Sequence, residues 1–464
     1  MPLSAPEAPV PPSSTKDRPD RRRSVALLAL AVLACGMLVA SPPPSASPEG
    51  VVLVVAATAA GLLLLREERL GRGPTLRMVV VAVALAGAVA VSFPPRGSND
   101  VWSYVMYGRT AAVHHASPYT HVPADYPRDP FLARTGQRWR HTPSVYGPVF
   151  VAYSSVGAWL AGGSAVLARL FHQLLALAAL ATAMYLVWGR TRSPAGLALL
   201  GLAPAVMVAT VNGGHNDLLV GVLILAGVLA ALSERPALAG AVIGVAAGIK
   251  ITAGLAALGL AIWYVRRRSW HAAIRSVVAT VGVVGLLYLA AGPSAVTALG
   301  ANRNLMSRAS AWQLPRHLLG LDTHRQVLLG WDRAEVVGTV ATVATVFAVL
   351  VGVALSWRRS SRSGPEDGVA VATAGYQVGG AYVLPWYAAW ALPTAMLRPH
   401  SRMTQLLAIH AGFLAAAYSL PRGLPPLAWL PDERFLVEYA VPLLALAAFV
   451  AVGSVPRRRV AVRG

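Results

Sequence analysis

The 464-residue sequence has one cysteine, Cys35, and few charged residues, which make up 13% of the chain. One cysteine cannot form an intramolecular disulfide, so any external loop must be held by packing and hydrogen bonds. Hydrophobic residues make up 56% of the chain, and long apolar segments recur from Val25 to Val452. This composition excludes an ordinary soluble domain and indicates a polytopic membrane protein.

Carboxylates are scarcer than cations, with 19 Asp and Glu against 40 Lys and Arg and a formal net charge of +21. The arginines lie in short loops between apolar segments rather than in a polar domain, which argues against nucleic-acid binding. Cytoplasmic loops of membrane proteins carry such an excess of Lys and Arg. The charge therefore predicts the orientation of the chain in a bilayer.

The apolar segments fall at 25–40, 51–65, 78–93, 165–188, 195–211, 217–232, 237–265, 273–291, 335–356, 368–397, 404–420 and 435–454. Because a helical span takes ~20 residues, the long runs 237–265 and 368–397 can each be a pair of short helices. Turns near Lys250 and Pro385, with 148–162 not spanning, place every Arg cluster in the cytoplasm. We expect an all-α polytopic membrane protein with about 12 to 14 transmembrane helices.

The predicted organisation is a disordered cytoplasmic tail over 1–23, a membrane domain over 24–456 and a basic cytoplasmic tail over 457–464. The apolar run after Arg21 to Arg23 looks like a signal-peptide core, but it continues past Cys35, so we expect an uncleaved first helix. Two larger polar segments, about 93–146 and 292–334, fall outside the cell. Polar chemistry is therefore expected on the extracytoplasmic face, with both termini in the cytoplasm.

Asp100 follows the Pro94-Pro95 pair that ends an apolar run, and an amphipathic stretch begins there. Ser98 or Asn99 can cap that stretch, and Asp100 can simply serve the helix N-terminus. The neighbouring side chains suit either a sugar pocket or an aromatic belt at the membrane interface. These neighbours include Trp102, Tyr104 and Arg109.

Two turn-forming aromatic motifs follow in the same polar segment, Ser117-Pro-Tyr119 and Thr142-Pro-Ser-Val-Tyr146-Gly-Pro148. They can shape a cleft or lie on the bilayer.

Between two apolar runs, Gly213-Gly214 is followed by His215, Asn216 and Asp217. Polar side chains at membrane depth are costly unless they are used, so these three are candidates for a functional site. Alternatively, the segment is an external turn in which Asn216 or Asp217 caps the next helix.

Lys250 lies alone between two short apolar arms, where it must face a cavity, an anion or lipid headgroups. A phosphate is a suitable partner for a compact ammonium, and snorkelling to headgroups is the alternative. Arg303 and Arg308 lie on the same predicted face and can bind a phosphate or remain solvated. The histidines of the first polar segment show no metal-ligand spacing, so we expect no catalytic metal and no cofactor.

Together these residues favour transfer from a sugar phosphate over glycoside hydrolysis. A glycoside hydrolase usually needs two carboxyl groups, one as acid and one as base or nucleophile. A departing phosphate needs cations instead of a general acid, and the acceptor hydroxyl needs one general base. One carboxylate with Lys and Arg meets that requirement.

The chain resembles membrane-embedded glycosyltransferases of the GT-C fold, which use polyprenyl-phosphate sugars and carry an acidic residue in the first large external loop. Within that fold it is most similar to the actinobacterial polyprenol-phosphomannose-dependent α-(1→6)-mannosyltransferases, and its Ala-, Val-, Arg- and Gly-rich composition fits such an origin. The resemblance covers about residues 75–400. It rests on Ser-Asn-Asp-Val-Trp-Ser-Tyr104, Ser-Pro-Tyr119, Tyr-Gly-Pro148, Gly-His-Asn-Asp217, Gly-Ile-Lys250 and Leu-Pro-Trp-Tyr387.

The resemblance implies an inverting enzyme without a covalent intermediate, in which Asp100 is the general base. Lys250, with Arg303 or Arg308, would hold the donor phosphate. The substrate would be lined by Trp102, Tyr104, Arg109, Tyr119, Tyr146, His215, Asn216, Asp217, Trp386 and Tyr387. The family motif often has two adjacent acids, and here Asn99 stands beside Asp100.

The expected donor is polyprenyl-phosphate mannose, and the expected acceptor is a glycolipid or polysaccharide of the cell envelope. Arabinofuranose and glucose donors would meet similar cations and remain alternatives. A transporter or flippase of a lipid-linked sugar is the alternative from another class of protein. Transporters usually show internal repeats and broken helices near the bilayer midplane. This sequence shows no convincing repeat, and its polar groups gather toward one face.

Overall fold

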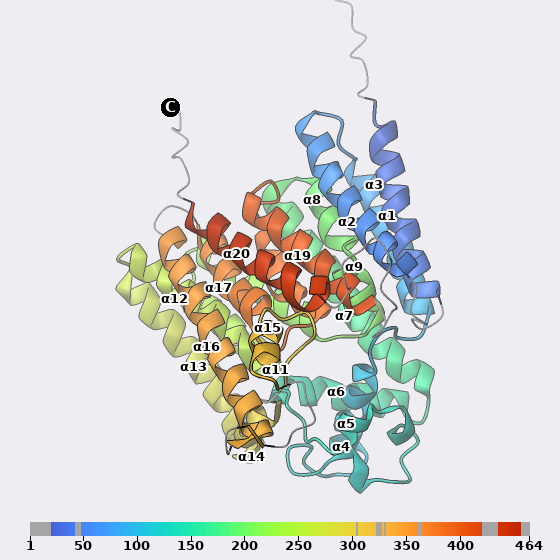
Figure 1. Cartoon of the computed structure of the whole chain (residues 1–464), viewed down its shortest axis with the longest axis vertical. Helices are drawn as coiled ribbons and strands as arrows, with labels where there is room; N and C mark the ends of the chain where they lie inside the picture. Colours follow the sequence, from blue (N-terminus) through green and yellow to red (C-terminus); the bar gives the residue numbers. More distant parts are fainter. Residues whose placement is uncertain are drawn as a thin grey trace, which may run out of the picture.

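The computed structural model describes residues 20–41, 48–302, 305–321, 327–328, 331–360, 364–419 and 435–455. Most of the described chain is helical, and Figure 1 shows the helices packed side by side. The predicted tails 1–23 and 457–464 lie wholly or almost wholly outside the described residues, as does Arg303.

The first half of the chain begins with three long helices, followed by a loop-rich segment and six further helices. The long helices are α1 (Arg22–Ala40), α2 (Pro48–Arg69) and α3 (Leu76–Ser92). The loop-rich segment holds α4 (Asp100–Ala112), the short turns η1 (Pro123–Asp125) and η2 (Leu132–Arg134), and α5 (Gln137–Arg140). Next come α6 (Pro148–Ala161), α7 (Ala165–Thr191), α8 (Pro194–Gly201), α9 (Pro204–Val206), the π-helix η3 (Met207–Asn212) and α10 (Asp217–Leu232).

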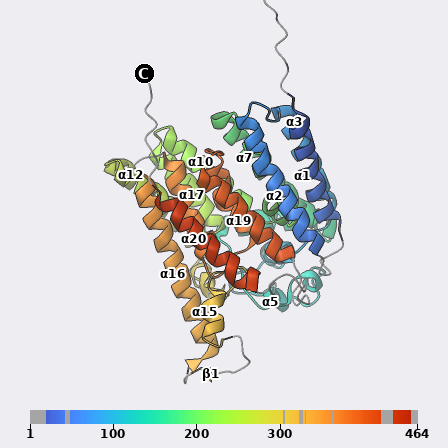
Figure 2. The ribbon, with the colours of Figure 1, turned by 45° about the horizontal axis from the view of Figure 1, so that its top comes forward.

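The second half contains the broken helices that were predicted near Lys250 and Pro385. They are α11 (Pro236–Ile249), η4 (Ile251–Ala253) and α12 (Gly254–Arg266), then α17 (Pro365–Gly379), η6 (Pro385–Tyr387) and α18 (Ala388–Ala395). The other elements are α13 (Trp270–Ala291), α14 (Ser294–Thr297), η5 (Ala298–Asn302), α15 (Gln313–Leu318), β1 (Val327–Leu328), β2 (Trp331–Asp332), α16 (Arg333–Ser360), α19 (Arg402–Ser419), η7 (Phe435–Ala440) and α20 (Val441–Ser454). The two strands form one antiparallel pair at the tip of α16, visible in Figure 2.

Side-chain caps and prolines start several of these helices where the sequence allows. Thr75 accepts a hydrogen bond from the N–H of Met78 at the start of α3, and Ser164 accepts one from Leu167 at the start of α7. Proline occupies the first position of α6, α11 and α17, where its missing N–H costs nothing.

By length and composition, six helices among the described residues can cross a membrane: Arg22–Ala40, Glu49–Arg69, Ala165–Thr191, Trp270–Ala291, Glu335–Ser360 and Phe435–Ser454. A pair bent by 48°, Pro194–Gly201 with Pro204–Asn212, is a seventh candidate. The protein is thus an all-α polytopic membrane protein, as predicted. Six or seven full-length spans are fewer than the predicted 12 to 14, because α3, α6, α10, α11 and the segment Ile251–Arg266 are shorter apolar helices.

The outer helix faces are apolar, as a lipid-facing surface requires. On α13, Leu286 is 71% exposed and Leu289 is 81% exposed, and on α7 Tyr185 is 76% exposed. The short helices α10 and α11 are instead enclosed by their neighbours: α10 packs against α11 and α18, and α11 packs against α13. Their ends therefore meet protein rather than lipid, which permits irregular backbone at that depth.

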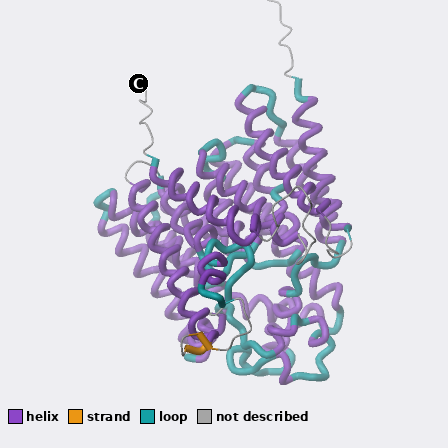
Figure 3. Tube along the Cα trace, in the orientation of Figure 1, coloured by secondary structure: helices purple, strands orange, loops and turns teal. Residues whose placement is uncertain are grey.

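The loops gather at the end of the molecule opposite its two described chain ends. In Figure 1, α1 begins and α20 ends at the top, whereas α4 and α5 lie at the bottom. Figure 3 shows long loop segments at that lower end. The loop-rich segment is anchored to the bundle by α4, which packs against α6 and α7.

Candidate active site

A cavity of about 320 Å³ lies where the start of α4 meets the break between α11 and α12 and the turn η6. We call it the aromatic cavity, because six rings line it: Trp139, Tyr146, Tyr376, Tyr382, Trp386 and Tyr387. Asp100 and Lys250 line it too. Five predicted site residues therefore share one cavity, namely Asp100, Tyr146, Lys250, Trp386 and Tyr387.

Asp100 is the first residue of α4, as the sequence predicted. Its backbone N–H donates to Ser98 Oγ at 3.1 Å, while Asn99 forms no side-chain cap. The Asp100 side chain is 16% exposed, and its Oδ2 lies 4.0 Å from Nδ1 of His215. Burial raises the pKa of Asp100 to about 6, although the charge of Lys250 and the hydrogen bond from Ser98 act in the opposite direction. A carboxyl group with this pKa can take up a proton near neutral pH.

Lys250 and Asp217 form a buried ion pair beside Asp100. Lys250 Nζ lies 2.7 Å from Asp217 Oδ1, and the indole N–H of Trp390 donates to the same oxygen. Asp217 is the first residue of α10, and Lys250 follows the last residue of α11. The Lys250 ammonium also lies over the rings of Tyr387 and Trp390, 4.5 Å and 5.1 Å from their centroids. A lysine predicted to need a partner at membrane depth thus has one within the protein.

His215 lies behind the cavity wall and connects Asp100 with the aromatic residues. Its ring stacks on Trp386 at 3.7 Å between centroids, and its Nδ1 is 3.1 Å from the Tyr104 hydroxyl. Tyr104 in turn accepts a hydrogen bond from the Tyr146 hydroxyl at 3.4 Å. The predicted residues His215 and Tyr104 are therefore neighbours of the site, though neither lines the aromatic cavity. Asn216 is buried next to them in the chain.

A close backbone contact holds Tyr146 against the Lys250 segment. The N–H of Gly147 donates to the carbonyl of Ile249 at 3.0 Å. A Cβ at Gly147 would collide with the carbonyl oxygen of Gly248. Small residues let backbones approach in this way inside membrane proteins. The Tyr-Gly-Pro148 motif thus sets the distance between the first loop and the break after α11.

Three predicted substrate residues lie elsewhere and organise the first loop. Arg109 Nε is 2.8 Å from Asp129 Oδ2, and the same carboxylate oxygen is 2.8 Å from His114 Nε2. The Trp102 ring stacks on Phe131. The third, Tyr119, packs in a separate cluster with Tyr288. Among the described residues these side chains do not line the aromatic cavity, so their contacts favour a structural role.

Of the two predicted phosphate-binding arginines, Arg303 lies outside the described residues, so the structure places Arg308 alone. Leu305 contributes to the cavity wall from their segment, whereas Arg308, within the described part of that segment, does not. The neighbouring Ser307 and Ser310 donate hydrogen bonds to the carbonyls of Ala381 and Gly380, which ties the segment to the turn before η6.

Sequence reasoning missed four aromatic residues around the site: Trp139, Tyr376, Tyr382 and Trp390. A partial signal existed for Tyr382, which begins the polar turn Tyr382 to Tyr387, and for Trp390, one helical turn beyond Trp386. Trp139 lies in an irregular loop, and Tyr376 lies inside an apolar helix, where a core position is the usual interpretation.

The model of a family described as alpha-(1->6)-mannopyranosyltransferase, N-terminal domain, matches residues 24–267, more than half of the chain. The chain belongs to this family. The match includes Asp100, the 215–217 triplet and Lys250, while Trp386 and Tyr387 lie beyond it.

Three relatives from actinobacteria are similar over part of their length. Alpha-(1->6)-mannopyranosyltransferase A of Corynebacterium glutamicum is 31% identical over 177 residues, which are 36% of this chain and 35% of the relative. Its namesake from Mycobacterium tuberculosis is 27% identical over 44% of this chain and 42% of the relative. A probable alpha-(1->6)-mannopyranosyltransferase of Mycolicibacterium smegmatis is 25% identical over 64% of this chain and 61% of the relative. The matches thus span about a third to three fifths of these relatives, and no solved structure matches the chain.

Removing Lys250 should destabilise the protein, because Asp217 would stay buried without a counter-charge. We expect Lys250→Met to cost about 3–5 kcal/mol and to lower the melting temperature of the protein in detergent. The double variant Lys250→Met/Asp217→Asn should regain most of that loss, since Asn can still accept from Trp390. A double variant no more stable than the single one would contradict a structural ion pair.

Gly147→Ala should separate Tyr146 from the Lys250 segment and lower the transfer activity that is proposed below. Overpacking of this kind costs about 1–3 kcal/mol, and we expect at least a tenfold loss of turnover in membranes. The matched control is Gly163→Ala, where an added Cβ meets nothing within 4 Å. Equal activity of both variants would show that the contact with Gly248 does not position the site.

Proposed function

We propose that this protein is an inverting mannosyltransferase. It transfers mannose from a polyprenyl-phosphate donor to a hydroxyl of a cell-envelope glycolipid or polysaccharide, on the extracytoplasmic side of the membrane. The observation that carries the proposal is Asp100 at the wall of the aromatic cavity, with its pKa raised by burial to about 6. Family membership supports the mannosyl group and the α-(1→6) linkage.

In the proposed reaction Asp100 takes the proton of the acceptor hydroxyl. The acceptor oxygen forms a bond to the anomeric carbon of mannose while the bond from that carbon to the phosphate oxygen breaks. The phosphate leaves with the bonding electron pair as polyprenyl phosphate. Attack opposite the leaving group inverts a β-linked donor to an α-linked product, and no covalent enzyme intermediate is needed.

The proposed reaction needs one base. The ion pair with Lys250 explains why the second carboxylate, Asp217, does not act as a base. Asp217 is held by Lys250 and Trp390, so it does not compete with Asp100 for the acceptor. The aromatic rings around the two groups offer flat apolar faces together with hydroxyl groups, as carbohydrate sites require. Asn99 beside Asp100 is consistent with a mechanism that uses a single acid.

The leaving phosphate needs positive charge, and the aromatic cavity offers little of it. Asp100 and Lys250 are the charged residues that line it, and the charge of Lys250 is already paired with Asp217 outside the lining. Lys250 keeps N–H groups for a ligand, so its predicted contact with the donor phosphate remains a prediction, as do those of Arg303 and Arg308.

The extracytoplasmic orientation is supported by the shape of the molecule. The described chain ends lie at one end of the bundle, and the loop-rich segment with α4 and α5 lies at the other (Figure 1). With the Arg-rich ends in the cytoplasm, the start of α4 and the cavity would face outward. The bilayer is the partner that the exposed apolar faces require.

A transporter or flippase of a lipid-linked sugar is the second candidate, because helices broken near Lys250 and Pro385 also occur in transporters. A lipid-linked-sugar flippase would not need an ionisable base in the cavity. The Asp100 variants below therefore separate the two functions.

Asp100→Asn should abolish transfer of labelled mannose from polyprenyl-phosphate mannose to membrane acceptors. A positioned general base contributes about 10²–10⁴-fold to the rate, so we expect a loss of that size. The control is Asp125→Asn, an acid of the same loop whose side chain accepts the N–H of Val122 and does not line the aromatic cavity. Transfer by Asp100→Asn near the level of the Asp125→Asn control would rule out the base.

The pH dependence of mannose transfer should report the ionisation of Asp100. Only the ionised form of Asp100 can take the proton, and its pKa is raised to about 6. The kcat/KM for acceptor should therefore be level above about pH 7 and fall about tenfold per pH unit below 6. A profile that is flat from about pH 7 to about pH 5 would show that the base ionises elsewhere.

A further inference from the structure

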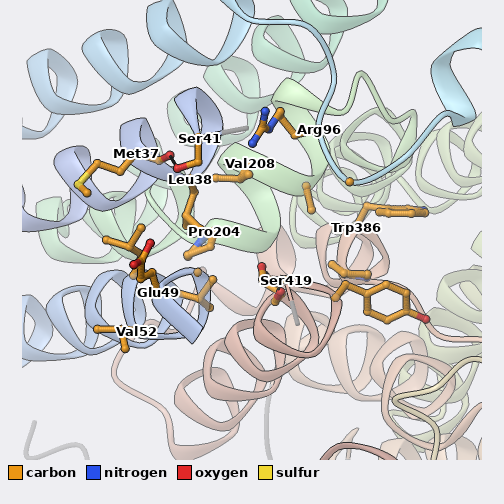
Figure 4. A pocket seen from close by; sticks show the side chains of 18 residues that line it. Met37, Leu38, Ser41, Glu49, Val52, Arg96, Pro204, Val208, Trp386 and Ser419 are labelled. Atoms are coloured by element: carbon orange, nitrogen blue, oxygen red, sulfur yellow. Dashed lines mark hydrogen bonds between the residues drawn. The ribbon is translucent and has the colours of Figure 1, made fainter. Parts of the chain in front are cut away.

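A second cavity, of about 610 Å³, lies directly beside the aromatic cavity. We call it the apolar pocket. It is formed by the end of α1, the start of α2, α9 with η3, and the end of α19 (Figure 4). Its lining is mainly aliphatic and includes Met37, Leu38, Leu53, Pro204, Val208 and Ala415.

Trp386 is the wall that the two cavities share, since it lines both of them. On the apolar side its neighbour is Pro385, and on the aromatic side its neighbour is Tyr387. The Trp386 ring stacks on His215, whose Nδ1 is 4.0 Å from Asp100 Oδ2. A ligand that fills the apolar pocket up to Trp386 therefore ends close to the proposed base.

Arg96 gives the apolar pocket a cation. Its backbone N–H donates to Asn212 Oδ1 at 2.9 Å, which fixes the loop that carries it. Within the described part of the chain, its side-chain Nε is buried and has no hydrogen-bond partner. Four positions separate Arg96 from Asp100, so their Cα atoms lie within about 14 Å of each other. In Figure 4, Glu49 and Arg96 lie on opposite sides of the pocket, so its two sides differ in charge.

These features fit a lipid phosphate better than a glycan. An aliphatic lining would leave the hydroxyl groups of a sugar chain without hydrogen-bond partners, which is costly. A hydrocarbon chain gains free energy there, and a phosphate at its end finds a guanidinium, which binds phosphate oxygens bidentately. The aromatic cavity has the opposite character, because Asp100 lines it and the lysine that lines it, Lys250, is already paired with Asp217.

From these two cavities we infer that the apolar pocket holds the isoprenoid chain of the donor and that Arg96 binds its phosphate. The aromatic cavity then receives the acceptor. The mannosyl group is transferred beside Trp386, where the two cavities meet. The inference rests on the proposed function, and it assigns the donor phosphate to Arg96 where the sequence had suggested Lys250. In this arrangement Lys250 balances the charge of Asp217.

The test measures donor and acceptor kinetics separately with the full-length protein in nanodiscs. Arg96→Gln should raise the KM for polyprenyl-phosphate mannose at least tenfold and leave the acceptor KM within about twofold of wild type. Arg96→Lys should recover part of the loss. The matched control is Arg128→Gln, an exposed arginine of the same external segment, which should change neither constant.

A variant that fills the apolar pocket tests whether this pocket holds the isoprenoid chain of the donor. Val208→Phe should reduce the preference of the enzyme for a long-chain donor over a short-chain analogue with the same phosphate and sugar. Its melting temperature is compared with wild type, to separate filling of the pocket from unfolding. An unchanged chain-length preference in a folded variant would overturn the assignment of the pocket.

Binding of polyprenyl monophosphate without sugar separates this inference from the proposed function. Wild type should bind it, and Arg96→Gln should bind it at least tenfold more weakly. If binding depends on Arg96 but no mannose is transferred, the proposed function fails while the lipid site stands. If Arg96→Gln changes the acceptor KM alone, or if a bilayer phospholipid competes equally well, the donor does not occupy this pocket.

Discussion

The buried ion pair between Lys250 and Asp217 is the interaction on which the site depends. Asp217 is fully buried and the Lys250 side chain is 13% exposed, so neither charge is well solvated without the other. The two residues lie where α11 ends and where α10 begins, so the pair joins two interruptions of the helical bundle. The rings of Trp390 and Tyr387 pack on the same ammonium and bring the turn around η6 to this point. Asp100 then completes the cavity from the first loop.

The short helices follow from the need to place this ion pair at helix interruptions inside the bundle. A helix that ran unbroken through the bilayer would place no backbone turn at the depth of the ion pair. Interrupted helices leave backbone groups unpaired, and these are tolerated in a membrane only where protein covers them. That is where α10, α11 and α18 lie, each enclosed by neighbouring helices. The six long helices can meet lipid, and α13 has exposed leucines suited to such a contact.

Much of this was predictable from residue type and spacing. Apolar runs of abnormal length predicted breaks near Lys250 and Pro385, and the cost of polar groups at membrane depth identified His215, Asp217 and Lys250. The pairing of those groups was not predictable, because a lysine selects a phosphate or a carboxylate by geometry that only the fold provides. Contacts within the loops were equally unpredictable from the sequence. Arg109 was predicted to contact the substrate, but it pairs with Asp129, twenty positions further along an irregular loop. Periodic patterns report which face of a helix is buried, and they carry no information about such contacts.

The proposed division of donor and acceptor between two cavities has an electrostatic reason. A phosphate next to Asp100 would disfavour the ionised carboxylate that the reaction needs, since a nearby like charge raises the pKa of an acid. Burial has already brought that pKa to about 6, so little further increase is compatible with a base that works near neutral pH. In the proposed arrangement, a phosphate held by Arg96 approaches the sugar from the apolar pocket and Asp100 approaches the acceptor from the aromatic cavity, so the two anions act from opposite sides of the anomeric carbon.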